Sequence, residues 1–404
     1  MTDELLQDQQ PDSTSEAAAL LPPVSRYRLT VLTPTLAGDG QKLAPIDYMV
    51  WKDQVNVLNQ KRIFRLLARG PRIESYLGQL RKSEKLDFAS WGGYAQNYAQ
   101  RRIAFDDPLT AEVYDKAPAE NCFIPTFAST HEGLCFPATV LKGAMRLAML
   151  VERASDAQVD AAVANLNGET PRRSAALLEA AVLGAAGVSR TRPVRISDSR
   201  PVANGATRVY LLRTAVLIQR GEKFEAAWKG ATRGSVPLNR AGEAAMALAE
   251  MAAPGTVFEG DFRMPVLFRR QETSRVLHWK RPAGPADIAS AANRAATHLL
   301  GAHKKFAEAA GIAQIGVLCD ALLKRVEEAQ AAGRFLVCVG WGTGLLAKSI
   351  WASVADEKLR EGLRFVPGYE QALRTGLPFP KTRKLIIRNG RPVSMPGWVE
   401  VELR

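Results

Sequence analysis

The chain has 404 residues, of which 47% are hydrophobic and 24% are charged, as in a folded protein long enough for two domains. Its 54 Lys and Arg residues against 41 Asp and Glu give a net charge of +13, which favours a polyanionic partner such as nucleic acid. No run approaches the roughly 18 apolar residues that span a membrane, and no signal-peptide pattern opens the chain. The four cysteines form no CxxC pair. We therefore expect a cytoplasmic protein with no membrane partner.

The N-terminal part of the chain combines a polar tail, a strand and a basic helix. Residues 1–25 are rich in Gln, Asp and Ser and predict a disordered tail. Polar and apolar residues alternate over 26–32, which predicts a half-buried strand, and Gly38-Asp39-Gly40 then predicts a turn with close backbone approach. Residues 61–80 predict a helix bent near Pro71. Its basic stripe is either a solvated face or an RNA-facing one and consists of Arg62, Arg65, Arg69 and Arg72.

The rest of the chain mixes helices and strands. We expect helices at 84–102, 139–153, 243–252, 285–309 and 311–332, and a helical hairpin at 155–187. We expect strands at 193–197, 207–218, 256–267, 334–339, 385–388 and 398–403. Without steady βαβ alternation, the pattern favours an α+β fold with antiparallel sheets. The ferredoxin-like (RRM-like) plan with large helical insertions fits best, divided into an N-terminal domain, 26–200, and a C-terminal domain, 201–404.

The most informative segment covers residues 136–146, where a strand end and a turn lead into a helix. We expect Thr139 to cap this helix by accepting hydrogen bonds from its first free N–H groups. Lys142 and Arg146 are four residues apart, so they project from one face beside a positively polarised helix end. Because a helical Gly costs about 1 kcal/mol relative to Ala, Gly143 predicts that another backbone lies very close. The segment is either a site for an anionic backbone or an ordinary helix with two solvated cations.

A second glycine loop follows the apolar segment 335–339 and contains Gly340, Gly342 and Gly344. Such glycines let backbone amides point at an anion, and a strand, glycine loop and helix would suggest phosphate binding. From Gly342 onward the spacing resembles a P-loop that ends at Lys348-Ser349, but Ala347 stands where that motif needs Gly. Too few residues follow for a nucleotide-binding sheet, so we do not expect an NTPase. A contact with RNA phosphates and a tight internal packing turn remain.

Taken together, the segments resemble the RAMP superfamily of CRISPR-associated proteins, in particular the terminal subunit that caps the crRNA 3′ end in the type III-A (Csm) effector complex. Four segments carry the resemblance by their order and spacing: 29–40, 137–146, 340–344, and the ending made of 380–385 and 396–399. The second is similar to that family's "PGSSLKGAIR" type of helix start, with Ala138 in place of Gly and Val140 in place of Ser.

The resemblance implies a non-catalytic subunit with RRM-like domains, no cofactor and no metal, which binds crRNA and supports its maturation in antiviral defence. Its partners would be crRNA and the other RAMP backbone subunits, and the family also suggests host trimming nucleases. The expected RNA-binding residues are Gly38, Gly40, Thr139, Lys142, Gly143, Arg146, Gly340, Gly342, Gly344 and Lys348.

Two other functions stay open. One is a RAMP-family endoribonuclease that processes crRNA, for which His131, just before the key helix, is the residue to test. Asp39 and Asp47 lie where sibling subunits carry a catalytic loop aspartate, although a turn-forming Asp39 and a solvated Asp47 fit the residues better. The other function is a basic protein–protein scaffold, whose interfaces would be marked by exposed tryptophans such as Trp51, Trp91 and Trp398.

Overall fold

The computed structural model describes residues 25–404 with the exception of 69, 71, 83–84, 87–94, 167–173, 232–233, 279–282, 366–368, 370–372 and 374–378. The predicted N-terminal tail, 1–25, therefore lies outside the described residues except for Ser25, which begins a strand. Arg69, Pro71 and Trp91 also lie outside them.

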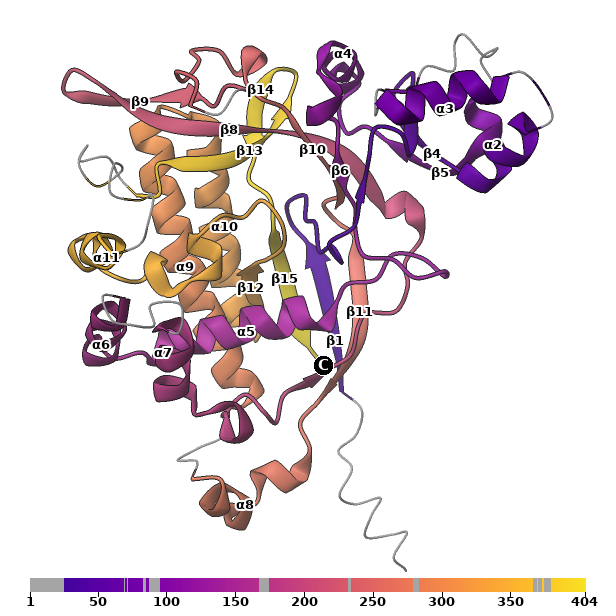
Figure 1. Cartoon of the computed structure of the whole chain (residues 1–404). Helices are drawn as coiled ribbons and strands as arrows, with labels where there is room; N and C mark the ends of the chain where they lie inside the picture. The colour runs from indigo at the N-terminus through magenta and orange to yellow at the C-terminus, as the bar shows by residue number, and fades with distance from the viewer. Residues whose placement is uncertain are drawn as a thin grey trace, which may run out of the picture.

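Sheet A is the layer that carries the first predicted strand (Figure 1). Its five antiparallel strands run in the order β12 (Phe335–Cys338), β15 (Trp398–Leu403), β1 (Ser25–Val31), β11 (Val257–Arg263) and β7 (Arg195–Ile196). Alternation along β1 buries Tyr27, Leu29 and Val31 on one face of the sheet. Leu29 pairs with Phe258 of β11 on one side and with Val401 of β15 on the other.

Sheet B lies beyond one end of sheet A. Its strands are β10 (Ala247–Ala252), β8 (Thr207–Arg220), β13 (Thr382–Arg388) and β14 (Arg391–Ser394), with β9 (Lys223–Trp228) paired to β8. The helix expected at 243–252 is wrong, because β10 pairs antiparallel with β8. This segment is rich in Ala, Leu and Met, which favour helices, but five of its six residues are buried in the sheet, and tertiary pairing overrides that preference.

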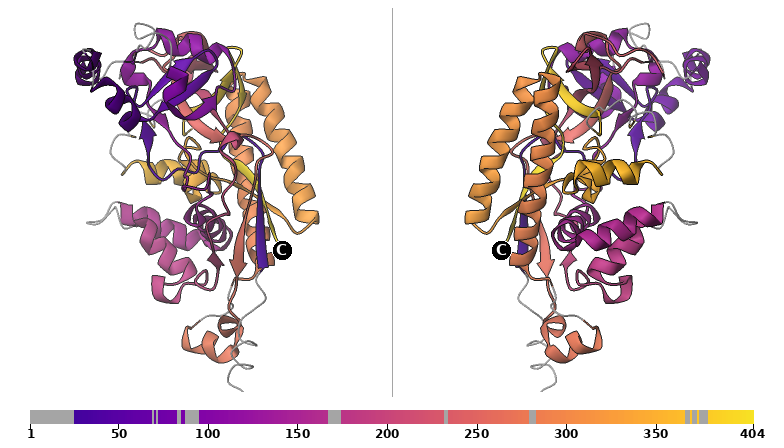
Figure 2. Two further views of the ribbon diagram at one scale, coloured as in Figure 1. Left: turned by 90° about the vertical axis from the view of Figure 1, so that its right-hand side faces the viewer. Right: turned by 90° about the vertical axis from the view of Figure 1, so that its left-hand side faces the viewer.

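Three helices cover the sheets. The helix α5 (Ala138–Arg153) crosses sheet A and contacts the long helix α9 (Pro285–Ala310), which pairs with α10 (Ala313–Ala331) (Figure 1). Gly311 adopts φ 65° between α9 and α10, a conformation that favours glycine and ends α9. Figure 2 shows α9 and α10 on one side of the molecule, and on the other the predicted hairpin of α6 (Asp156–Leu166) and α7 (Ser174–Leu183).

A smaller unit projects from the body at the upper right of Figure 1. It contains the three-stranded sheet of β3 (Tyr48–Trp51), β4 (Gln54–Leu58) and β5 (Ala99–Ala104), with α2 (Gln60–Leu67) and α3 (Arg72–Lys82) packed around its own apolar cluster. The helix expected at 61–80 is thus two helices. The helix expected at 84–102 is wrong at its C-terminal end, which forms β5.

The remaining elements are short. They include β2 (Lys42–Leu43) paired with β6 (Ile124–Pro125), and the helices α4 (Leu109–Lys116), α8 (Gln271–Val276) and α11 (Asp356–Leu363). One large core lies between sheet A, α5 and the first part of α9, and a second lies between sheet B, the rest of α9 and α10. The α+β class with antiparallel sheets is confirmed. Sheet A takes strands from both sides of residue 200, and the domain division there stays a prediction.

Candidate nucleic-acid interface

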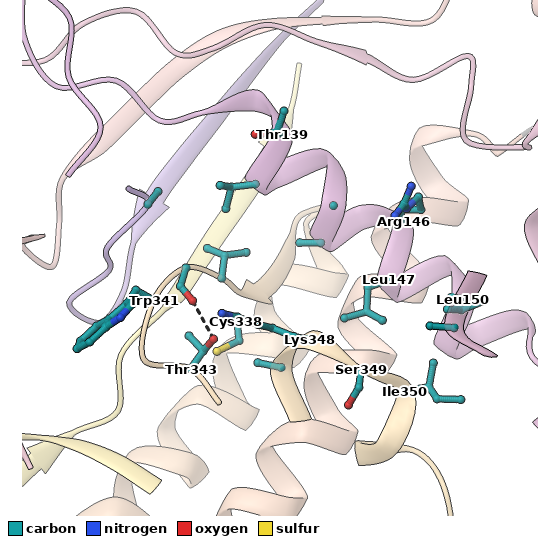
Figure 3. A pocket seen from close by; sticks show the side chains of 18 of the residues that line it. Thr139, Arg146, Leu147, Leu150, Cys338, Trp341, Thr343, Lys348, Ser349 and Ile350 are labelled. Carbon is teal, nitrogen blue, oxygen red and sulfur yellow. Dashed lines mark hydrogen bonds between the residues drawn. The ribbon is translucent and has the colours of Figure 1, made fainter. Parts of the chain in front are cut away.

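A cavity of about 930 Å³ lies where the predicted motifs meet (Figure 3). Its walls come from the loop after β1, from α5, α6 and α7, and from the glycine loop after β12 with the short 3₁₀ turns that follow. Seven of the ten expected RNA-binding residues line it: Gly38, Gly40, Thr139, Gly143, Arg146, Gly340 and Lys348. Lys142, Gly342 and Gly344 lie outside its lining. The fold therefore joins segments that are about 300 residues apart in sequence.

The start of α5 is capped differently from the expectation. The helix begins at Ala138 after Pro137, and Thr139 is an exposed residue of its first turn that faces the cavity. The Ala138 N–H donates to Oδ1 of Asp198 over 2.7 Å, so a carboxylate of the chain itself satisfies the first helix amide. The expectation that Thr139 caps the helix is wrong, because Asp198 on a distant segment supplies the acceptor.

The two cations of α5 have separate roles. The Nζ of Lys142 donates to the carbonyl oxygen of Val194 over 2.8 Å, and burial, together with Arg195 and Arg146, lowers the pKa of Lys142. Arg146 is half-exposed at the rim of the cavity and forms an ion pair with Glu179 of α7 at 3.1 Å. Lys142 is therefore not simply a solvated cation, because it holds the chain segment before β7.

Gly143 has open space above it. An added Cβ would find no atom within 4 Å outside the neighbouring helix backbone, and the residue is exposed at the cavity. No backbone among the described residues therefore packs close to Gly143, contrary to the expectation for a neighbour within the chain. The free space leaves room for a ligand to approach the helix backbone at this point.

The two predicted glycine loops contact each other. Gly340 adopts φ 91°, and an added Cβ would lie 2.2 Å from the carbonyl oxygen of Leu36. The same oxygen accepts the Trp341 N–H over 2.9 Å. A Cβ on Gly38 would likewise lie 2.8 Å from the carbonyl oxygen of Thr126, which confirms the close backbone approach predicted for that turn. Gly340 is thus a tight packing turn that fixes the loop after β1 at the edge of the cavity.

The other loop glycines also have backbone conformations that favour glycine. Their φ values are 86° at Gly342, 83° at Gly344 and 91° at Gly40. The segment that follows forms two 3₁₀ turns, at Leu346–Lys348 and Ile350–Ala352. Lys348 is exposed at the cavity rim. The described loop therefore lacks the strand–loop–helix arrangement of a P-loop.

Two further cations near this surface, Lys42 and Lys384, were missed by the sequence analysis. Lys42 is exposed at the rim, with its Nζ 4.4 Å from the ring centroid of Phe123. Lys384 of β13 places its Nζ 4.3 Å from the ring centroid of Trp341. The position of Lys42 just after the Gly38–Gly40 turn was an available signal. The pairing of Lys384 with Trp341 joins segments about 40 residues apart, and no local pattern indicates it.

The three candidate nuclease residues, His131, Asp39 and Asp47, have different surroundings. His131 is 90% exposed, with its Nε2 3.7 Å from Oε1 of Glu132, and it does not line the cavity. Asp39 accepts the Gln41 N–H over 3.0 Å, as predicted for a turn residue. Asp47 is half-buried and accepts the Ala44 N–H over 2.7 Å, so its interpretation as a solvated residue is wrong. Of the proposed interface tryptophans, Trp51 is partly exposed and Trp398 is buried.

Within the described ranges, no group of three or more His, Cys, Asp or Glu side chains is arranged to hold a metal ion. In the same part of the chain, no helix is both long and apolar enough to cross a membrane.

Comparison with solved structures identifies the fold of this protein. No protein-family model matches the sequence, and no curated protein matches it. A chain from the cryo-EM structure of a Csm–crRNA–target RNA ternary complex of a type III-A CRISPR-Cas system matches with a TM-score of 0.64 at 18% identity, covering 94% of this chain and all of that one. The crystal structure of T. onnurineus Csm5 matches with a TM-score of 0.60 at 16% identity, covering 92% of this chain and 99% of that one.

The match covers nearly the full length of both relatives, so the chain has the fold of Csm subunits from one end of its described part to the other. The resemblance predicted from the sequence is confirmed at the level of the fold.

Proposed function

We propose that the chain is a non-catalytic, crRNA-binding subunit of a type III-A CRISPR effector complex that caps the 3′ end of the guide and supports its maturation. The observation that carries the proposal is the cavity rim. The exposed cations Lys42, Arg146 and Lys348 line the same cavity as a helix glycine, Gly143, on which nothing else in the described chain packs.

The fold supports the proposal. In chain order, sheet A and its helices run β1, α5, β7, β11, α9 and β12, which follows the β-α-β-β-α-β order of a ferredoxin-like domain. The C-terminal strand β15 lies between β12 and β1 as an addition to that plan. We assign this unit as the RRM-like RAMP domain of the chain.

The chemistry of the rim suits a guide RNA. Cations and loop amides contact phosphates, which position a strand without reading its sequence. A guide-carrying subunit needs this property, because each guide differs in sequence. The binding free energy would depend strongly on salt, since neutralised phosphates release counterions. The partners we propose are crRNA and sister RAMP subunits, and recruitment of trimming nucleases stays a prediction that no comparison bears on.

Co-purification of the tagged chain from its host, followed by sequencing of the bound RNA, tests this function. The proposal expects short RNAs that share a repeat-derived 5′ end, together with sister RAMP subunits. Recovery of the chain without RNA would overturn it. Cleavage of RNA by the purified chain, lost in His131→Ala, would instead establish the endoribonuclease alternative.

A further inference from the structure

The cavity interior is apolar, although its rim is basic. The helix α5 carries two apolar stripes, one of which is buried against sheet A through Leu141, Met145, Ala148 and Met149. The other faces the cavity, where Leu147 and Leu150 lie across from Ile350 (Figure 3). Leu178 of α7 completes the wall, so a surface made of aliphatic side chains lies just inside the cationic rim.

The charge around this apolar wall has one sign. Among the described residues that line the cavity, Glu179 is the only acid, and Arg146 already pairs with it. Lys42 and Lys348 are exposed and form no ion pair that the structure shows. A ligand that satisfies both surfaces combines an apolar surface with an attached anionic group, and the face of a nucleobase together with its phosphate provides both. The volume of about 930 Å³ lies within the range of small-ligand pockets, which is roughly 300–1,000 Å³.

We propose that the cavity takes one unstacked nucleobase of the bound RNA, with the adjoining phosphates held at the rim by Lys348, Arg146 and Lys42. This inference rests on the proposed function and adds to it a defined base site. Aliphatic walls contact the faces of a base and leave its hydrogen-bonding edge unread, so the site distinguishes bases by size alone. A purine buries more apolar surface than a pyrimidine, so we expect purines to bind there more tightly.

The helix α7 offers a matched pair of variants. Ala175 and Ala176 are adjacent exposed residues of α7, and only Ala175 lines the cavity. Ala175→Phe therefore adds a ring at the cavity, whereas Ala176→Phe adds the same ring to the same helix elsewhere. Neither change replaces a buried residue or a cation of the rim.

The test uses the full chain and single-stranded RNA oligonucleotides that carry 2-aminopurine at each position in turn. The inference expects one position whose fluorescence changes severalfold more than that of its neighbours on binding. An abasic nucleotide at that position should weaken binding about tenfold, the effect expected for one stacked base. Ala175→Phe should remove both effects and Ala176→Phe should preserve them.

The alternative outcomes separate the two proposals. If RNA binds equally well to both variants and every position responds alike, the base site is overturned while RNA binding stands. If wild-type chain binds no RNA, the proposed function fails and the base site fails with it. If Ala175→Phe releases a sister subunit but leaves the RNA signals unchanged, the cavity is a protein-docking groove and the base site is overturned.

Discussion

At position 143, the stability of helix α5 would favour alanine, whereas the proposed RNA site would favour glycine. Glycine inside α5 destabilises the helix, yet no neighbouring atom in the described chain requires the absence of a Cβ there. Gly340 is the opposite case, because both its φ of 91° and the nearby Leu36 carbonyl require glycine. The two glycines were predicted for the same role, and only the structure separates them.

For Gly143→Ala we expect the free energy of unfolding to rise by about 0.5–1 kcal/mol, since alanine favours the helix. We expect RNA affinity to fall, because the added methyl occupies space that the RNA backbone uses. Denaturant unfolding and RNA-binding titrations measure the two effects. Gly316→Ala on α10, where a Cβ also meets nothing within 4 Å, should raise stability and leave RNA affinity unchanged. Unchanged affinity in Gly143→Ala would remove this glycine from the RNA path.

For the glycine loop we compare Gly340→Ala with Gly344→Ala, because the two residues share a positive φ but differ in contacts. Gly344→Ala should destabilise the fold by about 1–2 kcal/mol through backbone conformation alone. Gly340→Ala should lose a further 1–3 kcal/mol, roughly, because its Cβ overlaps the Leu36 carbonyl oxygen. Chemical denaturation measures both. Equal losses of stability would show that the contact with the loop after β1 is not the reason why position 340 needs glycine.

His303 gives a pH-dependent prediction. Its side chain is buried in α9, its Nδ1 accepts the Arg383 Nε–H over 3.0 Å, and burial with the Arg383 charge lowers its pKa well below the usual value. The unfolded chain takes up the proton near pH 6.5, about the ordinary His value, before the folded chain does. Stability is therefore fully present above that pH and is lost as the pH falls toward the folded pKa. His303→Gln, which keeps an acceptor, should flatten the stability curve below pH 6.5. Parallel curves for the two proteins would contradict this assignment.

At the scale of elements, ion pairs and caps join segments that are distant in sequence. The Asp198 carboxylate caps α5 from a position 60 residues away, and Lys142 returns a hydrogen bond to the same region at Val194. Arg101 of β5 makes two hydrogen bonds of 2.8 Å to the carboxylate of Glu250 on β10, which also accepts from the Thr207 hydroxyl. The Arg101–Glu250 pair joins the projecting unit to sheet B.

Arg101→Met should destabilise the chain by about 3–5 kcal/mol, because the Glu250 carboxylate is fully buried and would lose its counter-ion. The double variant Arg101→Met/Glu250→Met should recover much of that loss, since no unpaired charge stays buried. Guanidinium denaturation of the two variants measures both values. A loss below about 1 kcal/mol in the single variant would mean that the pair behaves as an exposed surface pair.

Local patterns predicted the elements whose periodicity is strong and missed those defined by pairing. The alternation in 26–32 and the long amphipathic helices α9 and α10 were readable, as were the two glycine loops that meet at Leu36. The residues of β10 predict a helix, because Ala and Met favour helices. The segment is a strand because it pairs with β8. The cap at Asp198 and the contact of Lys384 with Trp341 depend on tertiary packing, which sequence spacing does not encode.

At the scale of the whole molecule, the effect of the net charge of +13 depends on where the basic residues lie. Arg101 is neutralised by its ion pair with Glu250, and the Lys142 ammonium is held in place by the Val194 carbonyl. Arg146 and Lys348 stay accessible at the cavity where the first-strand loop, α5 and the glycine loop meet. If RNA follows this surface, these two positions should contribute to the salt dependence of binding, and exposed cations on distant helices should not.

The most direct test is the salt dependence of single-stranded RNA binding by Arg146→Gln/Lys348→Gln, followed by fluorescence anisotropy. Removing two phosphate contacts should weaken binding at every salt concentration and reduce the slope of log K against log salt by about 1.4, at roughly 0.7 per contact. The control Lys305→Gln/Lys324→Gln removes two exposed cations of α9 and α10, outside the cavity lining, and should leave the slope unchanged. Equal slopes for wild type and the cavity variant would contradict the account.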